Sequence, residues 1–360
     1  MDISVIVPLY KGNKYVPNIY NMVFRNAQNA PDCEMELILV NDFPGEPIDM
    51  TDCGQNIKVR LIDHSENMGI HGSRVSGLKA ATGRYILILD QDDCIDPMFV
   101  YSQMHAIGDA DACICNGIYR GTREIIPDEY ARENVCDKTH YAKTLEGIIS
   151  PGQALIKRTS LPGEWIDNIL RFNYCDDAFL WLLMKDKDAE FVVNMNNLYV
   201  HNETDENTSY NWSNNAKALT ELKKVITERR LLSADMENLF LKAVDAKIKK
   251  HETYAKTQER LSRLEENFES IKISTERSVA VYGCGVLGKQ LIDILRRNDI
   301  KPAFLVDSNI RLLDGMAVLS TDDIWPDADL MIVTPVLDYD NIRRVAQKKG
   351  MTEVVSLLDI

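Results

Sequence analysis

Three carboxylates stand within four residues at Asp90-Gln91-Asp92-Asp93. Like charges this close repel one another, and a divalent cation is the natural compensation. Carboxylate oxygens suit Mg²⁺ or Mn²⁺, which proteins commonly use to hold the phosphates of a substrate. The apolar segment 85–89 leads directly into the run. This placement predicts that the carboxylates lie at the carboxyl end of a strand, where α/β sheets bind ligands. The alternative interpretation is a solvated acidic turn that caps a helix.

Arg74 lies in a second segment, 67–77, that is rich in small residues. A guanidinium is a planar fork that can bind a phosphate or a carboxylate, and small neighbours let a helix approach a ligand closely. Taken alone, an arginine such as this is more often part of a surface ion pair.

A glycine pattern of the form G-x-G-x-x-G occurs near the end of the chain, at Gly283, Gly285 and Gly288. It follows a predicted strand over 279–282 and opens a predicted helix over 289–297. Asp307 comes about 20 residues after the last glycine, as the dinucleotide-binding fingerprint requires. Two interpretations stay open. The loop binds a nucleotide, or the glycines only permit tight packing of strand and helix in a docking or assembly module.

The elements that must position these residues alternate between strand and helix. Short apolar runs predict strands over 3–7 (ended by Pro8), 36–40, 59–63 and 85–89, and helices are predicted over 16–30 and 72–81. This rhythm predicts an α/β fold with a mainly parallel sheet and helices on both of its faces. The pair Asn41-Asp42 then lies at the same edge of the sheet as the acidic run.

A chain of 360 residues is long enough for about two domains. We expect a first domain over 1–212, a helical linker over 213–275 and a small Rossmann-like α/β domain over 276–360. The linker prediction rests on a change of composition near residue 211, where glycine and proline vanish and apolar residues recur at helical spacing.

The N-terminal part resembles a family 2 glycosyltransferase, whose nucleotide-binding fold is called GT-A. The resemblance rests on four segments that occur in the family's order: 5–10, 37–42, 67–77 and 81–93. Any one of them is weak evidence, but together they are specific. Including a weaker second half, the resemblance covers the chain to about residue 210.

The resemblance implies roles for individual side chains. The nucleotide would be held by Pro8, Tyr10, Asp42 and Arg74, with Asp90 approaching the ribose. Asp92 would bind the Mn²⁺ or Mg²⁺ ion that bridges the donor diphosphate. The sequence departs from the family at Lys11, where asparagine is frequent, and at Phe43-Pro44, where glycine and serine are frequent.

The resemblance also implies an acceptor side. Asp176-Asp177 resembles an acidic pair of which one member acts as general base on the acceptor hydroxyl, a role that typically contributes about 10²–10⁴-fold to the rate. We prefer Asp177 slightly, and helix capping by either aspartate is the alternative. His201 is a candidate second metal ligand, or else a structural histidine. By analogy, Gly152-Gln153 and Trp165 are expected to line the acceptor pocket.

Composition narrows the class of protein. The net charge of −14 argues against an extended nucleic-acid surface. No apolar run approaches the roughly 20 residues of a membrane-spanning helix, and Met1 to Val5 does not resemble a secretory signal. The eight cysteines are scattered without a C-x-x-C pair, so we expect free thiols and a cytoplasmic protein.

The sequence thus predicts a metal-dependent, inverting hexosyltransferase that moves a sugar from a nucleoside-diphosphate donor, expected to be a UDP-sugar, to a hydroxyl acceptor. A glycan or lipid-linked acceptor in the synthesis of surface polysaccharide or a glycoconjugate is the expected context, with peripheral membrane association and homo-oligomerisation as further expectations. Two alternatives stay open: a catalytically silent transferase-like scaffold, and an NAD-dependent oxidoreductase built on the C-terminal glycine pattern.

Overall fold

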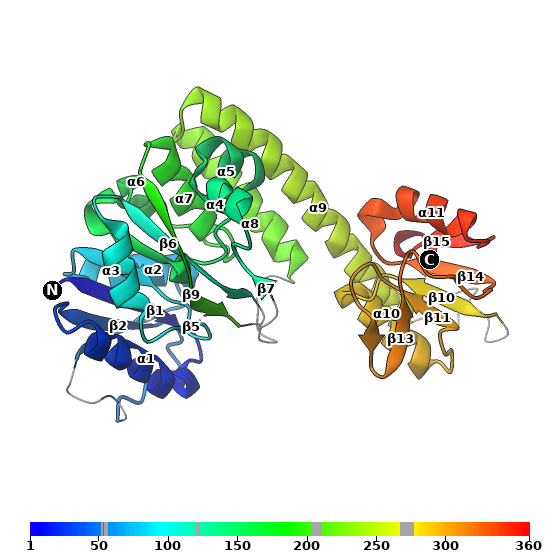
Figure 1. The fold of residues 1–360 in the computed structure, drawn as a ribbon, viewed down its shortest axis with the longest axis horizontal. Helices are drawn as coiled ribbons and strands as arrows, with labels where there is room; N and C mark the ends of the chain where they lie inside the picture. The colour runs from blue at the N-terminus through cyan, green and yellow to red at the C-terminus, as the bar shows by residue number, and fades with distance from the viewer. Residues whose placement is uncertain (52, 54–56, 120–122, 203–210, 267–276) are drawn as a thin grey trace. The chain divides into compact units, whose positions relative to one another are not determined.

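The computed structural model describes residues 1–51, 53, 57–119, 123–202, 211–266 and 277–360. The chain divides into two compact units, Met1–Ile248 and Lys249–Ile360. Each unit contains its own sheet with helices around it (Figure 1). None of the helices in the described ranges is long and apolar enough to span a bilayer.

The described part of the first unit contains one sheet with the strand order β3-β2-β1-β4-β8-β6-β9-β5, and β7 pairs with β6. The strands are β1 (Ile3–Leu9), β2 (Met35–Asn41), β3 (Lys58–Asp63), β4 (Tyr85–Ile88), β5 (Cys94–Ile95), β6 (Ala112–Tyr119), β7 (Arg123–Glu124), β8 (Ala154–Lys157) and β9 (Phe191–His201). β1 to β4 pair in parallel, as the alternating pattern predicts. β8 is antiparallel to both of its neighbours, so the other half of the sheet is mixed. The predicted α/β class is confirmed.

Helices cover both faces of this sheet because apolar side chains alternate along its strands. The helices are α1 (Val16–Asn29), α2 (Gly69–Ala80), α3 (Phe99–Ile107), α4 (Glu129–Cys136), α5 (Lys138–Thr144), α6 (Gly163–Asp167), α7 (Asp176–Asp186), α8 (Trp212–Arg229) and α9 (Ala234–Glu266). Ile6 and Ile38 belong to a core shared with α2, α7 and α8, whereas Val5 and Leu37 belong to a core shared with α1 and α3. The two cores lie on opposite faces of the sheet.

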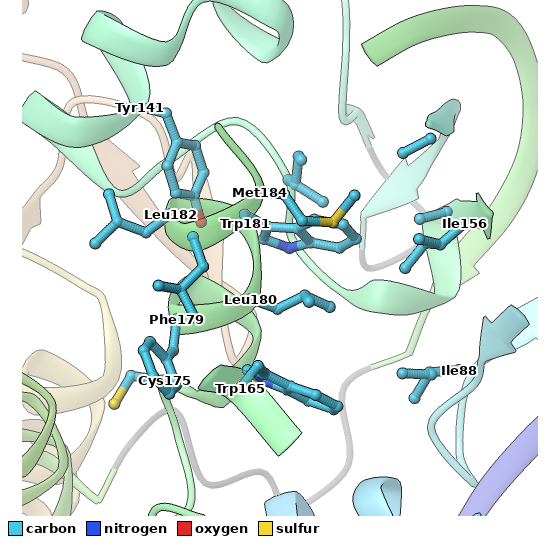
Figure 2. Close-up of a cluster of buried hydrophobic side chains, with 14 of the residues drawn as sticks. Ile88, Tyr141, Ile156, Trp165, Cys175, Phe179, Leu180, Trp181, Leu182 and Met184 are labelled. Carbon is cyan, nitrogen blue, oxygen red and sulfur yellow. The ribbon is translucent and has the colours of Figure 1, made fainter. Parts of the chain in front are cut away.

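Helix α7 is buried on nearly every side. Six consecutive residues, Phe179 to Met184, are almost fully buried. They belong to one core cluster with Trp165, Tyr141 and the strand residues Ile88 and Ile156, which Figure 2 shows around α7. Because α7 is packed all round, its first turn, which carries Asp176 and Asp177, is held firmly in place.

The observed division differs from the expected domain boundaries. Leu219, Leu222 and Ile226 of α8, with Phe240 and Val244 of α9, are buried in the core of the first unit. Residues 213–248 therefore pack with the first unit, because their apolar stripes cover the sheet and α7. The expected boundary between residues 275 and 276 lies outside the described residues.

The sequence predicted that Pro8 ends the first strand, and this is wrong. β1 continues to Leu9, with Pro8 opposite Val40 of β2. Ile6 accepts from Leu89 N on the β4 side, and Leu9 accepts from Asp42 N on the β2 side. Pro8 faces the β4 side beyond the end of β4, so its missing N–H costs no ladder hydrogen bond.

Gly77 lets α2 lie directly on β1. A Cβ at this position would come within 2.3 Å of Ile6 Cγ2, which is too close for any side chain. This contact sets the position of the helix that carries Arg74.

The second unit is a smaller α/β structure. Its strands are β10 (Val279–Tyr282), β11 (Phe304–Val306), β12 (Leu312–Leu313), β13 (Met316–Leu319), β14 (Leu330–Val333) and β15 (Val354–Ser356), and its further helices are α10 (Val286–Arg297) and α11 (Tyr339–Lys348). The strand order is β12-β13-β11-β10-β14-β15, parallel except for the β12–β13 hairpin. β10 has β11 on one side and β14 on the other, so the glycine pattern follows the strand at which the order reverses.

A buried carboxylate stabilises the edge of the first sheet away from the candidate site. Glu36 is fully buried and accepts from Ser4 Oγ and from Thr82 N and Oγ1 at 2.6–2.8 Å, and Arg60 lies 3.1 Å away. Burial opposes its ionisation, but the hydrogen bonds from Thr82 and Ser4 and the charge of Arg60 outweigh burial, so the pKa of Glu36 is lowered.

Glu36→Gln is expected to lower the free energy of unfolding by about 1–3 kcal/mol at pH 7, because donors that face the carboxylate lose their charged acceptor. Since the folded pKa is lowered, the difference from the parent should be present above the ordinary pKa of 4.5 and vanish as the pH falls through the folded pKa. Urea unfolding at several pH values measures this. Glu34→Gln, at a side chain that is 77 % exposed, is the control, and an equal effect in both variants would contradict the prediction.

Candidate active site

A cavity of about 780 Å³ lies at the carboxyl ends of β1, β2 and β4. Every residue predicted to bind the nucleotide or the metal or to act as the base lines it: Pro8, Tyr10, Asp42, Arg74, Asp90, Asp92, Asp176, Asp177 and His201. These residues come from strand ends, from the middle of α2, from the start of α7 and from the end of β9. The parallel order of β2, β1 and β4 brings their carboxyl ends to one edge, which explains the convergence.

An aromatic pair marks one end of the cavity, where Tyr10 lines the wall and Phe43, which does not line it, packs against Tyr10. Tyr10, at 44 % exposed, meets Phe43 edge to face with ring centroids 5.2 Å apart. The Nζ of Lys11 lies 5.6 Å from the Tyr10 centroid and 5.4 Å from that of Phe43. The two departures from the family pattern, Lys11 and Phe43, thus lie together, and they leave a half-exposed aromatic ring on which a flat base can stack.

Gln91 ties this aromatic end to the acidic run. Its Oε1 accepts from Tyr10 N at 3.0 Å and its Nε2 donates to Tyr10 O at 3.2 Å. A Cβ on Gly12 would lie 2.8 Å from the same Oε1, so the loop after β1 closes tightly on the amide. The side chain between the carboxylates therefore orders the Tyr10 backbone.

Asp42 is nearly buried beside the aromatic end. Its Oδ1 accepts from Met68 N at 2.7 Å and lies 2.8 Å from His64 Nδ1, and His64 Nε2 lies 2.9 Å from Ser76 Oγ. The sequence pattern did not single out His64, although it follows the end of β3 just as Asp42 follows β2. The strand-end rule that selected Asp42 would have selected it too.

Arg74 joins the two acidic groups of the cavity. Its Nη1 donates to Asp176 Oδ2 at 2.7 Å and its Nη2 donates to Asp90 Oδ1, while Ser150 Oγ donates to Asp90 Oδ2 at 3.2 Å. Burial disfavours the charge, but Asp176 and Asp90 outweigh it, so the pKa of Arg74 is raised. The arginine lies in the predicted pocket, and both of its terminal nitrogens contact carboxylates.

The two aspartates at the start of α7 have different surroundings. Asp176 is 2 % exposed and paired with Arg74, and Trp165 Nε1 donates to its backbone oxygen at 2.7 Å. Asp177 is half-buried on the cavity wall, and its Oδ1 accepts from Ala178 N. Burial, helped by the charge of Asp176, raises the pKa of Asp177 to about 7. A base works best when its pKa is near the working pH, which favours Asp177 for that role.

His201 and Asp92 face the same cavity. The buried carboxylate of Asp93 lies 3.2 Å from His201 Nδ1 and accepts from Asn202 N at 3.0 Å, and it also contacts the hydroxyl of Tyr199. A carboxylate on one ring nitrogen is the usual arrangement of a metal-binding histidine, because it orients the other nitrogen toward the ion. Among the described residues, no group of three or more His, Cys, Asp or Glu side chains is arranged to hold a metal.

The opposite end of the cavity is more apolar. Its wall is formed by Tyr141, Leu145, Ile148, Tyr174 and Leu219. Tyr174 has a φ of 138°, which is strained for an aromatic residue and directly precedes the acidic pair. Residues expected by analogy to line this end, Gly152-Gln153 and Trp165, do not do so, because they are buried behind the wall.

The C-terminal glycine loop has the backbone that its pattern predicts. Gly283 has a φ of 95°, and a Cβ on Gly288 would lie 1.9 Å from Gly283 O, whereas nothing lies within 4 Å of a Cβ on Gly285. Asp307 Oδ2 accepts from Cys284 N at 2.8 Å, and its Oδ1 accepts from Asn309 N at 2.8 Å. Asp307 therefore stabilises the loop itself, and nucleotide binding there stays a prediction.

The N-terminal part is similar to a known protein family and to curated relatives. Residues 4–167 match the model of the family described as Glycosyl transferase family 2. EpsH of Bacillus subtilis is 27 % identical over 149 residues, or 40 % of this chain and 42 % of EpsH. TarS of Staphylococcus aureus, a poly(ribitol-phosphate) beta-N-acetylglucosaminyltransferase, is 30 % identical over 99 residues, or 27 % of this chain and 17 % of TarS. The chain thus spans less than half the length of these relatives.

Solved structures resemble the chain at low sequence identity. S. aureus TarS 1–349 superposes with a TM-score of 0.49 and 19 % identity, covering 82 % of this chain and 79 % of that chain. The mannosyltransferase PcManGT from Pyrobaculum calidifontis, in complex with GDP-Man and Mn²⁺, gives a TM-score of 0.48 and 14 % identity, covering 74 % of this chain and 75 % of that chain.

Proposed function

We propose, on the match of residues 4–167 to the glycosyltransferase family 2 model, that the protein transfers a sugar from a nucleoside-diphosphate donor, a UDP-sugar, to a hydroxyl acceptor. The observation that carries the proposal is that one cavity is lined by all nine predicted side chains. They include an aromatic ring, the carboxylate pair Asp176-Asp177 and the candidate general base. The name of the relative TarS, an N-acetylglucosaminyltransferase, is consistent with a sugar donor of this kind.

In this proposal the aromatic end holds the nucleobase. Tyr10 offers its half-exposed ring for stacking, Pro8 lies beside it, and Asp42 accepts a hydrogen bond from the base. Asp90 approaches the ribose. Arg74 keeps the charges of Asp90 and Asp176 compensated while the pocket fills.

The residues present fit a divalent cation, Mn²⁺ or Mg²⁺. Asp92 and His201 would hold it, with Asp93 orienting the histidine, and the donor diphosphate would complete the coordination, as is common for Mg²⁺ sites. When bound, such an ion neutralises the charge that develops on the departing diphosphate.

The acceptor would enter at the apolar end beside Asp177. The carboxylate accepts the proton of the acceptor hydroxyl while the hydroxyl oxygen bonds to the anomeric carbon, and the bond from that carbon to the diphosphate oxygen breaks. Attack opposite the leaving group inverts the configuration. The strained residue Tyr174 and the packed helix α7 fix the position of the Asp177 carboxylate. A fixed general base lowers the free-energy cost of reaching the transition state.

The wider context follows from the proposed reaction. We further propose that the acceptor is a glycan or is lipid-linked, and that the reaction serves the synthesis of surface polysaccharide or a glycoconjugate. The protein would act in the cytoplasm, associate peripherally with a membrane and form a homo-oligomer. A silent transferase-like scaffold and an NAD-dependent oxidoreductase are the competing functions.

The proposed function is tested by thermal shift and by product release. UDP, GDP, CDP and NAD are added with and without Mn²⁺, and UDP release from UDP-sugars is followed with and without candidate acceptors. A Mn²⁺-dependent shift with UDP and slow acceptor-independent release of UDP are expected. Binding without any release would favour the scaffold, and a shift with NAD alone would favour the oxidoreductase.

A truncated chain that ends near residue 274 is expected to bind UDP with about the parent affinity. All nine side chains that line the donor and acceptor ends lie within Met1–Ile248, which is a compact unit with its own core. Calorimetry on the two chains measures the affinity, and light scattering reports any change of oligomeric state. A folded truncated chain that binds no nucleoside diphosphate would place Gly283, Gly285 and Gly288 in the donor site.

A further inference from the structure

Three side chains, Asp42, His64 and Ser76, form a partly buried hydrogen-bonded network that begins at the cavity residue Asp42. His64 follows β3, and its Nδ1 lies 2.8 Å from Asp42 Oδ1 at the end of β2, while its Nε2 lies 2.9 Å from Ser76 Oγ on α2. The side chains of His64 and Asp42 are 8 % and 6 % exposed. The His64 backbone is fixed as well, because its N–H donates to Asn41 O at 3.0 Å.

The network fixes the orientation of the Asp42 carboxylate. A carboxylate only accepts, so Nδ1 carries the hydrogen toward Asp42, and in the neutral ring Nε2 accepts from the Ser76 hydroxyl. Met68 N donates to the same Oδ1 at 2.7 Å. Within the described residues, the hydrogen bonds to the Asp42 side chain all use Oδ1. Oδ2 is therefore the oxygen that is presented to a ligand at the cavity wall, where Asp42 lies.

The order aspartate, histidine, serine is also that of a hydrolytic triad, but the surroundings do not suit hydrolysis. Ser76 lies within α2, Gly69–Ala80, whose amides bond along the helix and cannot form an oxyanion hole. His64 and Ser76 do not line the cavity that holds Asp42. The hydrogen-bonded side chains of His64 and Ser76 can therefore affect a ligand in the cavity only through Asp42.

We propose that His64 is the positioning residue for nucleobase selection. It holds Asp42 so that Oδ2 accepts a hydrogen bond from a base that presents a ring N–H, as uracil does at N3. Cytosine presents an acceptor at N3, so a fixed, ionised carboxylate repels it. A carboxylate free to rotate would instead reach the amino group of cytosine and lose the distinction. The inference rests on the proposed nucleotide-sugar function and adds to it a residue that determines nucleobase specificity.

The test compares the affinities of UDP, CDP and pyrophosphate, each with Mn²⁺, by calorimetry on the full chain. His64→Leu removes both hydrogen bonds and is expected to weaken UDP binding by about 10-fold or more and to lower the UDP/CDP preference by a similar factor. Pyrophosphate affinity should change by less than about 2-fold, because the device acts only on the base. The double variant Asp42→Asn with His64→Leu should be no weaker for UDP than Asp42→Asn alone.

Conservative replacements separate positioning from general packing. Asparagine places its amide nitrogen near the position of Nδ1, so His64→Asn should restore UDP affinity to within about 3-fold of the parent, whereas His64→Gln, which reaches toward Ser76, should not. His105→Leu makes the same replacement at an exposed helical histidine away from the cavity and should change nothing. If His64→Leu does not fold, Ser76→Ala should show a smaller loss that is also confined to UDP.

The outcomes distinguish this inference from the function beneath it. If the parent binds no nucleoside diphosphate, the proposed function fails. If the parent binds UDP but His64→Leu binds it equally well, or loses UDP and pyrophosphate alike, or is not rescued by asparagine, the inference alone is overturned. A parent that prefers CDP would overturn it as well.

Discussion

Asp92→Asn is expected to abolish the Mn²⁺-dependent binding of UDP. Asp92 lines the cavity together with His201, and the two are the proposed protein ligands of the cation. Replacing a residue that only orients a metal ligand typically costs about 10–100-fold in metal affinity. Removing a ligand from a site with two should cost at least about 100-fold. Calorimetry with UDP in the presence of Mn²⁺, and again with EDTA, measures the effect.

The control for this variant is an aspartate outside the cavity. Asp109→Asn removes the same charge from an exposed turn after α3 and should leave UDP affinity unchanged. The residual UDP affinity of Asp92→Asn should match that of the parent in EDTA, because the nucleobase pocket is intact. If Asp92→Asn binds UDP as tightly as the parent in Mn²⁺, Asp92 is not a metal ligand and the proposed role of the acidic run is wrong.

The part of the site that sequence could predict is the part set by neighbouring parallel strands. Asp42 and Asp90 each follow an apolar run, and parallel strands deliver their carboxyl ends to one edge of a sheet. The same reasoning places Tyr10 after β1, and the small-residue segment 67–77 places Arg74 on α2. For these residues the local pattern, together with one topological rule, is enough to predict that they meet.

The contacts that could not be predicted join distant segments. Asp93 meets His201 because β5 pairs with β9, and Gln91 reaches Tyr10 across 81 positions of sequence. Such contacts depend on where the mixed strands insert and on individual side-chain conformations, neither of which has a local signal. The apolar stripes of α8 were visible in the sequence, but periodicity indicates only that a face is buried and not which surface it covers.

The slight preference for Asp177 over Asp176 had no physical basis before the structure. Adjacent aspartates are indistinguishable by pattern, and both suit a helix start. Both aspartates line the cavity, but the contact with Arg74 fixes Asp176 in an ion pair, whereas Asp177 accepts from the backbone N–H of Ala178. A base must be free to accept a proton, so the pairing decides the proposed assignment.

Asp177→Asn is therefore expected to lower kcat by about 10²–10⁴-fold while the donor Kd changes by less than about 2-fold. In the parent, kcat should fall as the pH drops through about 7, because only the ionised carboxylate accepts a proton and the pKa of Asp177 is raised to about 7. Asp176→Asn removes the neighbouring negative charge and frees Arg74, and both changes lower the pKa of Asp177. Its kcat profile should therefore shift to lower pH. Equal losses of donor affinity and turnover in both variants would instead indicate a structural cap.

As the pH rises through 7, the contribution of Asp177 to the stability of the fold should fall while turnover rises. The pKa of Asp177 is raised in the folded state from an ordinary value of 3.8 to about 7, so between these values the folded chain binds more protons than the unfolded chain and stability falls as the pH rises. Asp177→Asn removes that decrease, and its melting temperature relative to the parent should increase from pH 4 to pH 8. Asp109→Asn, at an exposed carboxylate, should not reproduce the trend. A variant that is inactive yet gains stability toward alkaline pH would identify Asp177 as a carboxylate held in the fold for its chemistry, since a helix cap would lose stability on the same replacement.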